Sequence, residues 1–385
     1  MLGLHWKTQQ SSTATTISPS KDTRIVGRVL VSYLTEPVEW QDADPRFLGH
    51  SNLWESRSII QQFLSLGYVV DTINYTDTAF LPTEHYDTVF DIYTNLQRLA
   101  PHLPTTTIKL LHLTGSYAPF QNQAELGRVR ELEERRKSHY SPKRLVRDVE
   151  LFERSLQLAD ACSLIGNEVT LRTFPENYRQ KISLVTVSAT ALPTTKNDTM
   201  FVPNPREFLW FFGGGMVHKG LDLVLESFAQ YPNATLHIIG NVEVEKDFIS
   251  IYRHELFDTP NIHYHGYILP HTAQFREIAN RCVAFLAPSC SESISTAAAT
   301  VMQYGLYPLV SRATGITLPP NSGIYLEHCS IPEIRRCIQQ VQEMEVEVLR
   351  QQIRRTQRFA LDHYSRDNFT INMHTYLSTL LPKPA

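Results

Sequence analysis

Two stretches in the second half of the chain hold the residue types that bind anions and hydroxyl groups. Residues 287–304 read APSCSESISTAAATVMQY and follow a short apolar run, 283–286. This pattern predicts a strand, a polar loop with a single acid, Glu292, and a helix that stops at Gly305. The loop would bring one carboxylate and several free backbone N–H groups to the carboxyl end of a strand, where open α/β sheets bind ligands. Such a site suits a ligand with a phosphate at one end and hydroxyl groups at the other.

The second stretch is a run of three glycines, Gly213, Gly214 and Gly215, between a predicted strand and a predicted helix. Glycines let the backbone approach a ligand closely, and Lys219 adds a cation beside the first N–H groups of the helix, which suits a diphosphate. The spacing differs from G-x-x-x-x-G-K-[ST] and from G-x-G-x-x-G followed by an acid, which disfavours a nucleoside triphosphatase loop and a nicotinamide cofactor. A simple tight turn would explain this stretch equally well.

The elements that must position these residues alternate between strand and helix. Apolar runs in the first half predict strands at 28–34, 68–73, 87–93, 108–113, 161–165 and 182–187. Amphipathic periodicity predicts helices between them, for example at 54–66. The alternation starts afresh with a strand at 208–212 and closes with helices at 343–364 and 369–381. Two such series predict an α/β protein with two Rossmann-like, doubly wound domains.

Composition marks the boundaries of these domains. Residues 188–206 contain several prolines and threonines without periodicity, which is typical of a linker. The N-terminus is rich in Ser and Thr and has no apolar h-region, which indicates a disordered tail and not a signal peptide. The segments that we expect are a tail at 1–21, an N-terminal domain at 22–190, a linker at 191–206, a C-terminal domain at 207–365 and a terminal helix at 366–385 that packs back on the N-terminal domain.

The overall composition narrows the class of partner. The 385 residues are 42% hydrophobic and 19% charged, with a net charge of −3, so no general attraction to nucleic acid is expected. Five scattered cysteines lack metal-ligand spacing, so we expect neither a zinc site nor a disulfide framework. No apolar run reaches about 18 residues, so we expect no transmembrane helix, and a cytoplasmic location with reduced thiols.

The segments FLWFFGGGMVHKGLDLVL at 208–225 and 287–305, with the spacing to NIHYHGY at 261–267, resemble the C-terminal domain of retaining family 4 (group 1) glycosyltransferases. More loosely, the resemblance covers the whole chain from Arg28. It implies the GT-B fold, in which two Rossmann-like domains face a central cleft. It also implies a hexosyltransferase that moves a sugar, with retention, from a nucleotide-diphosphate sugar to a hydroxyl acceptor such as a glycan, polysaccharide or glycolipid. The nucleotide sugar would be a co-substrate, so no cofactor is expected.

The resemblance assigns roles to individual residues. A lysine in the position of Lys219 holds the donor diphosphate, an acid in the position of Glu292 contacts the hydroxyls of the donor sugar, and the segment around Gly266 and Tyr267 lies near the base. The other expected donor-binding residues are Gly213, Gly214, Gly215, His218, Gly240, Ser291, Ser293, Ile294, Ser295, Thr296 and Thr300. Lys219 and the loop N–H groups would stabilise charge on the leaving diphosphate without a metal ion, since no D-x-D motif occurs in a suitable loop.

Two positions depart from the family pattern. The family usually has an arginine five residues before the lysine, where this chain has Gly214, and a second glutamate eight residues after the first, where it has Thr300. A threonine hydroxyl cannot clamp a ribose diol as a carboxylate does. We therefore expect altered nucleotide affinity or base choice, with Arg312 and His218 as candidates for the missing positive charge.

The acceptor is expected to bind to the N-terminal half. His112 ends the strand in LLHLTGSY, and a histidine there often lies beside the reacting sugar in the family, so it joins Glu292 and Lys219 as a catalytic candidate. A lone histidine is equally often a structural residue. Weaker acceptor-binding candidates are His50, Asn52 and Glu55.

A basic cluster within residues 128–147 could touch anionic lipid or an acceptor phosphate, so peripheral contact with the inner membrane face stays open. A solvated helix face with i,i+4 ion pairs is the favoured interpretation of this cluster.

Two alternatives to a transferase also stay open. One is a degenerate GT-B protein that binds sugar nucleotides without transfer, which Gly214 and Thr300 favour and Lys219 and Glu292 oppose. The other is a GT-B sugar-nucleotide epimerase, which would need acids and histidines from both domains, and the first half offers few.

Overall fold

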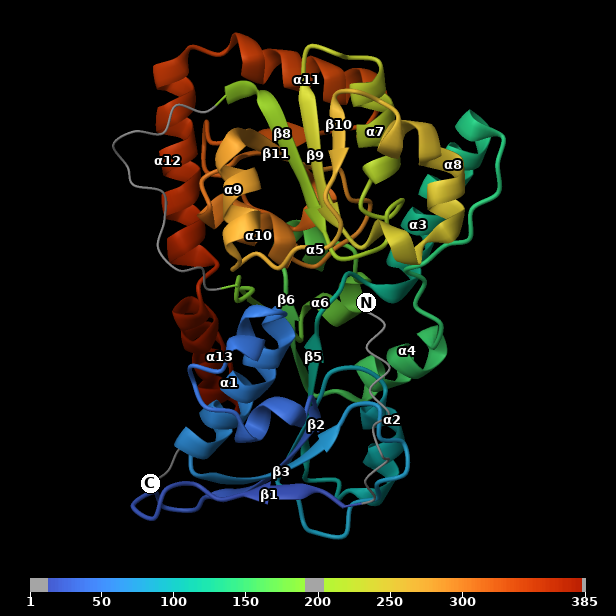
Figure 1. Ribbon diagram of the computed structural model, residues 1–385. Helices are drawn as coiled ribbons and strands as arrows, with labels where there is room; N and C mark the ends of the chain where they lie inside the picture. Colours follow the sequence, from blue (N-terminus) through green and yellow to red (C-terminus); the bar gives the residue numbers. More distant parts are fainter. Residues whose placement is uncertain (1–12, 191–203, 383–385) are drawn as a thin grey trace. The chain divides into compact units, whose positions relative to one another are not determined.

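The computed structural model describes residues 13–190 and 204–382. The chain divides into two compact units, and each contains one sheet flanked by helices (Figure 1). The described residues of the unit that we call the N-terminal unit are 13–118, 147–188 and 366–382. Those of the C-terminal unit are 119–146, 189–190 and 204–365. None of the helices in these ranges is both long and apolar enough to cross a bilayer.

The N-terminal unit is built on a seven-stranded sheet in the order β1-β3-β2-β4-β5-β6-β7. The strands are β1 (Thr15–Ile17), β2 (Gly27–Tyr33), β3 (Tyr68–Asn74), β4 (Thr88–Asp91), β5 (Ile108–Leu113), β6 (Ala161–Ile165) and β7 (Ile182–Val185). The helices are α1 (Ser51–Ser65), α2 (Asn95–Leu99), α4 (Val149–Leu158), α5 (Glu168–Leu171), α6 (Glu176–Arg179) and α13 (Arg366–Leu380). All strand pairs are parallel except β1 with β3, and α1 packs beside α13 while α2 packs beside α4.

The edge strand β1 corrects the expectation of a disordered tail at 1–21. It pairs antiparallel with β3, and Thr16 Oγ1 donates a hydrogen bond to Asp71 Oδ1 at 2.6 Å. The guanidinium of Arg28 holds the other oxygen of Asp71 at 2.7 Å. Main-chain hydrogen bonds to β3 and the contact with Asp71 therefore order this strand. Neither interaction requires an apolar run, so the sequence pattern did not indicate a strand here. Residues 1–12 lie outside the described chain.

The C-terminal unit is built on a six-stranded sheet in the order β10-β9-β8-β11-β12-β13, in which every pair is parallel. The strands are β8 (Asn204–Phe212), β9 (Thr235–Gly240), β10 (Ile262–Tyr264), β11 (Cys282–Ala287), β12 (Tyr307–Ser311) and β13 (Ile324–Leu326). The helices are α3 (Ala118–Arg136), α7 (Leu221–Ala229), α8 (Lys246–Phe257), α9 (Ala273–Arg281), α10 (Thr296–Gln303), α11 (Ile331–Glu343) and α12 (Val346–His363). A buried aromatic group that includes Phe208, Trp210 and Phe228 forms part of its core.

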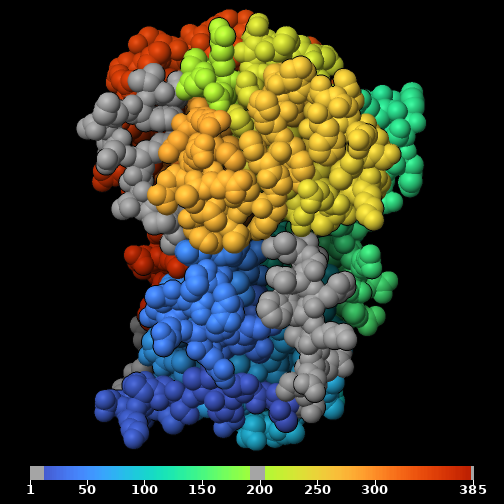
Figure 2. All heavy atoms as spheres, viewed as in Figure 1, coloured from blue at the N-terminus to red at the C-terminus, as the bar shows by residue number. Residues whose placement is uncertain are grey.

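The segment 119–146 packs on the C-terminal unit, although its place in the sequence suggested the N-terminal domain. Arg135 Nη2 lies 2.5 Å from Asp222 Oδ2, Arg136 pairs with Glu255, and both ion pairs are largely buried. In Figures 1 and 2 this segment, coloured teal to green, lies against the yellow residues of α8. The basic cluster is thus not the solvated face that we expected, because two of its cations are held by carboxylates on α7 and α8.

The other predicted boundaries also shift. The linker expected at 191–206 falls mostly outside the described residues, and its last three residues, 204–206, belong to β8. The helix expected at 343–364 is confirmed as α12, which packs on α10, whereas α11 before it was not predicted and packs on α7. The terminal helix α13 packs on α1, with Thr370 Oγ1 3.1 Å from Ser58 Oγ.

Candidate donor-binding site

The acid loop, residues 288–295 between β11 and α10, is fixed by contacts on both of its flanks. Ser311 Oγ donates to the main-chain oxygen of Ser289 at 2.6 Å. The Ser295 N–H donates to the main-chain oxygen of Thr314 at 2.8 Å, while the Ser295 side chain caps the first turn of α10. The shape of this loop is therefore set by β12 and by the turn that follows it.

That turn requires a glycine where it approaches the acid loop. Gly315 has a φ of +67°, and a Cβ at this position would lie 1.5 Å from the main-chain oxygen of Ser293. Any other residue would strain the backbone and push the two segments apart. The position of Glu292 thus depends on a glycine more than 20 residues further along the chain.

The structure brings the two chemically interesting stretches together. Lys219 Nζ lies 2.5 Å from Glu292 Oε2, and both side chains are about nine-tenths buried. Ser289 Oγ donates to the other oxygen, Glu292 Oε1, at 2.9 Å. Lys219 precedes Gly220, which is the N-cap of α7 and has a φ of +73°. A Cβ on Gly220 would collide with Pro288 of the acid loop. The ammonium and the carboxylate therefore meet because β8 and β11 are neighbouring parallel strands whose carboxyl ends carry these loops.

Burial and charge act in opposite directions on this pair. Burial lowers the pKa of the Lys219 ammonium, and the carboxylate of Glu292 opposes part of that shift. Burial by itself raises the pKa of Glu292, but Lys219 and His218 outweigh it, so the net shift is downward. A buried ammonium and carboxylate in contact form a strong, charge-assisted interaction that a ligand would have to share or displace.

His218 anchors the acid loop from the other side. Its Nε2–H donates to the main-chain oxygen of Ser291, and burial lowers the pKa of its imidazole. Its Nδ1 lies 3.5 Å from Glu125 Oε2, and Cys290 Sγ lies 3.6 Å from the same nitrogen. Because only 2% of its surface is exposed, His218 acts here as a link between the two stretches and not as a ligand-facing cation.

The glycine run already holds an anion from the protein itself. Glu245 Oε1 accepts a hydrogen bond from the Gly215 N–H at 2.7 Å, and both carboxylate oxygens lie within 3.3 Å of the Met216 nitrogen. Tyr140 O–H donates to Glu245 Oε2 at 2.6 Å. The Gly215 amide, which we expected to meet a diphosphate, thus binds a carboxylate together with the Met216 amide. No signal in the sequence singled out Glu245 or Tyr140, since they come from two distant loops.

The remaining donor-binding candidates divide into buried and half-buried positions. Thr300 is buried in α10, and its hydroxyl accepts a hydrogen bond from the Thr190 N–H at 3.3 Å, so it faces the protein interior. Ser291, Ile294 and Ser295 are buried, whereas Gly213, Gly214, Ser293, Thr296, Gly266 and Tyr267 are not fully buried.

Gly240 has a structural requirement of its own. A Cβ there would lie 2.6 Å from the main-chain oxygen of Phe212, and its N–H donates to the Gly266 oxygen at 3.0 Å. Gly240 and Gly266 therefore join β9 to the chain after β10.

His112, the catalytic candidate of the N-terminal unit, is fully buried at the end of β5. Its Nδ1 lies 2.8 Å from Ser163 Oγ, its ring stacks on Phe90, and burial lowers its pKa to about 3. Its Nε2 is buried without a hydrogen-bond partner among the described residues. A histidine in this setting is neutral and behaves as part of the core, so its catalytic role stays a prediction.

The three acceptor-binding candidates lie at the start of α1 but differ in exposure. His50 is exposed and caps the helix, with its Nδ1 accepting from the Asn52 N–H at 3.3 Å. Glu55 is buried and accepts hydrogen bonds from the Ser188 N–H and Oγ at 3.3 and 3.1 Å. Burial raises the pKa of Glu55 to about 7. Only His50 and Asn52 of this group therefore retain accessible surface.

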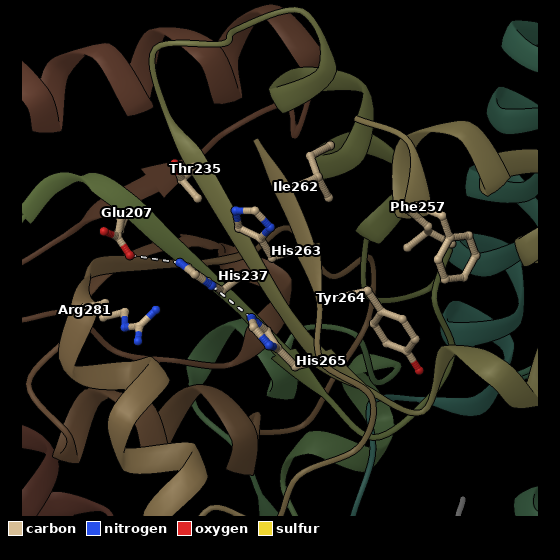
Figure 3. Close-up of a pocket in the computed structure, with 10 residues that line it drawn as sticks. Glu207, Thr235, His237, Phe257, Ile262, His263, Tyr264, His265 and Arg281 are labelled. Carbon is tan, nitrogen blue, oxygen red and sulfur yellow. Dashed lines mark hydrogen bonds and ion pairs between the residues drawn. The ribbon is translucent and has the colours of Figure 1, made fainter. Parts of the chain in front are cut away.

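A separate hollow of about 660 Å³ lies over β8, β9 and β10 and contains none of the predicted site residues (Figure 3). Burial lowers the pKa of the His237 imidazole, and Glu207 opposes part of that shift. Its Nε2–H donates to Glu207 Oε2 at 2.9 Å, and its Nδ1 lies 2.9 Å from His265 Nε2. Within the described chain, no group of three or more His, Cys, Asp or Glu residues is placed to hold a metal ion.

Residues 207–341 match the family described as glycosyl transferases group 1. No sequence among the curated proteins matches the chain. Three solved structures at 11–13% identity resemble the chain and show the fold alone.

These three structures illustrate the likeness. Sucrose-phosphate synthase from Thermosynechococcus elongatus has a TM-score of 0.62 at 13% identity, over 92% of this chain and 99% of that chain. Anabaena HepE, solved in complex with UDP-glucose, has a TM-score of 0.58 at 11% identity, over 92% and 100%. WaaG, a glycosyltransferase involved in lipopolysaccharide biosynthesis, has a TM-score of 0.55 at 12% identity, over 91% and 99%.

These matches confirm the predicted α/β fold with two Rossmann-like domains. The chain has the GT-B fold, and its residues 207–341 match the glycosyl transferases group 1 family.

Proposed function

We propose that this protein is a retaining, metal-independent hexosyltransferase that moves a sugar from a nucleotide-diphosphate sugar to a hydroxyl acceptor. The contact between Lys219 and Glu292 carries the proposal, because it places a cation and a carboxylate together at the carboxyl ends of β8 and β11. The likeness to HepE, solved with UDP-glucose, supports a nucleotide sugar as donor.

The two side chains would act on different parts of the donor. Negative charge builds up on the diphosphate as the glycosidic bond breaks, and the Lys219 ammonium would stabilise it in a site from which water is largely excluded. Glu292 would accept hydrogen bonds from sugar hydroxyls and orient the ring. Front-face attack by the acceptor requires no protein nucleophile, so Glu292 need not form a covalent bond.

The acceptor would be a glycan, a polysaccharide or a glycolipid bound to the N-terminal unit. The likeness to WaaG, a glycosyltransferase involved in lipopolysaccharide biosynthesis, supports this class of acceptor. His50 and Asn52 are the acceptor candidates that keep accessible surface. We place the enzyme in the cytoplasm, in polysaccharide biosynthesis, with peripheral contact to the membrane where the acceptor is lipid-linked.

A donor-panel assay with mass spectrometry of the products tests this function. We expect transfer or slow hydrolysis with one of the UDP, GDP or ADP sugars, and a loss of about 100- to 1,000-fold in Glu292→Gln. Glu347→Gln is the matched control, since Glu347 pairs with Arg350 on the surface of the same unit at 2.6 Å. Full activity of Glu292→Gln would refute the role given to this carboxylate.

A sugar-nucleotide-binding protein without transferase activity is the second candidate. Two observations favour this second candidate. The Gly215 N–H already donates a hydrogen bond to Glu245, and the Thr300 hydroxyl faces the protein interior. Binding of a nucleotide sugar without turnover against any acceptor would support this candidate, whereas a changed sugar in the recovered donor would indicate an epimerase.

A further inference from the structure

The cations identified so far at the glycine run are largely neutralised by the protein. Lys219 is paired with Glu292, and His218 is buried between Glu125 and the main-chain oxygen of Ser291. Glu245 adds a carboxylate at the Gly215 and Met216 amides. A donor diphosphate carries negative charge on both phosphates, so binding it here calls for at least one further cation.

Arg144 lies directly over the glycine run. A Cβ built on Gly215 would lie 2.8 Å from Arg144 Cγ and 3.0 Å from Arg144 Cδ, so the aliphatic stem of the arginine fills the space above this glycine. The main chain of Arg144 is held in place, because its N–H donates to Glu125 Oε1 at 2.7 Å and its oxygen accepts from Gln121 Nε2 at 2.6 Å.

The guanidinium of Arg144 lacks the carboxylate partner that its neighbours have. In the described part of the chain no acid lies within ion-pair distance of it, whereas the nearby Lys143 pairs with Asp247 at 2.6 Å. The Nε atom of Arg144 is buried and makes no hydrogen bond to a described residue. A buried N–H without an acceptor is costly, and a phosphate oxygen is a good acceptor for it. The positive charge of Arg144 also acts to lower the pKa of Lys219 and His218, which places it close to both.

We propose that Arg144 binds the donor diphosphate and supplies, from the segment 119–146, the cation that Gly214 does not provide. The proposal rests on the function proposed above and extends it to a residue outside the matched range 207–341. The arginine would reach the phosphates from the open side of the glycine run, while Lys219 reaches them from the start of α7.

Binding measurements by calorimetry, with UDP, GDP and ADP and with the matching monophosphates, test this role. We expect Arg144→Ala to weaken binding of the preferred diphosphate about 10- to 100-fold, the range for losing a charge-assisted hydrogen bond. The monophosphate should lose less, so the preference for diphosphate over monophosphate should shrink. Arg144→Lys should be intermediate, because it keeps the charge but loses the planar fork.

Arg130→Ala is the control, since Arg130 is exposed on α3 of the same unit and its loss removes the same charge. Arg130→Ala should bind like the wild type. If Arg144→Ala also binds like the wild type while Lys219→Met is weakened, the role of Arg144 is refuted and the proposed function stands. If the wild type binds none of the three diphosphates, the proposed function fails and this inference fails with it. Should Arg144→Ala not fold, unchanged diphosphate preference in Arg144→Lys and Arg144→Gln would refute the proposal instead.

Discussion

The ion pair between Lys219 and Glu292 leads to a stability prediction that also governs how the catalytic test must be done. The charged atoms are 2.5 Å apart and their side chains are only 9% and 12% exposed. With an effective dielectric constant of about 20, the gross attraction is about 7 kcal/mol, and desolvation of both groups offsets most of it. Removing one partner leaves the other charge buried and alone, which typically costs about 3–5 kcal/mol.

The perturbation is therefore a double-mutant cycle with Lys219→Met and Glu292→Gln. Each single variant should lose about 3–5 kcal/mol in free energy of unfolding, whereas the double variant should lose less than the sum, with a coupling of about 2–3 kcal/mol. Urea unfolding followed by fluorescence measures all four proteins. The exposed pair Arg312–Glu327, with side chains about half exposed, is the control cycle and should give a coupling below about 1 kcal/mol.

The pH dependence of the stability of Lys219→Met tests the same ion pair independently. Without the ammonium, burial raises the pKa of Glu292 in the folded state above that of the unfolded chain, so this variant should be more stable at pH 5 than at pH 8 relative to the wild type. Additive single variants, or a Lys219→Met whose deficit does not change with pH, would refute the reasoning. Activities of the single variants are interpretable only at temperatures where each variant is folded.

Three further outcomes follow from other parts of the structure. Glu55 has a folded pKa of about 7, so wild-type stability should fall by about 3 kcal/mol between pH 4.5 and pH 7 relative to Glu55→Gln, and parallel pH profiles of the two proteins would contradict this. Gly315→Ala should lower the melting temperature and the activity together, while Gly127→Ala, where a Cβ meets nothing within 4 Å, should stabilise by about 0.5–1 kcal/mol. Tyr140→Phe removes a donor to Glu245 and should cost about 1.5–3 kcal/mol in urea unfolding, and a cost near zero would show that the carboxylate does not need it.

The fold followed from the sequence because its signals are local. Apolar runs such as 108–113 and 161–165 coincide with β5 and β6, and helix α7 follows the glycine run, where a helix was predicted. The proximity of Lys219 to Glu292 could also be predicted, because both residues follow strands that a parallel sheet brings side by side.

What the sequence could not show depends on contacts between distant segments. Glu245 binds the Gly215 amide, and Arg144 lies over the same glycine, yet neither residue belongs to a local motif. The burial of His112 is another example, since its position at a strand end suggested exposure while its ring packs on Phe90. Periodicity reports which face of an element is apolar, but it does not report which loop will cover that element.

The ion pairs of segment 119–146 have a consequence for synthesis on the ribosome. Arg136 is made 119 residues before Glu255, its partner on α8. At about 5–20 residues per second, Arg136 waits roughly 6–24 s before Glu255 is made. The N-terminal unit therefore contains an excursion of chain that cannot dock until the C-terminal unit is made, and its own last helix, α13, is made later still. Translation pauses or chaperones that act within this interval would change the yield of folded protein without any change in its final contacts.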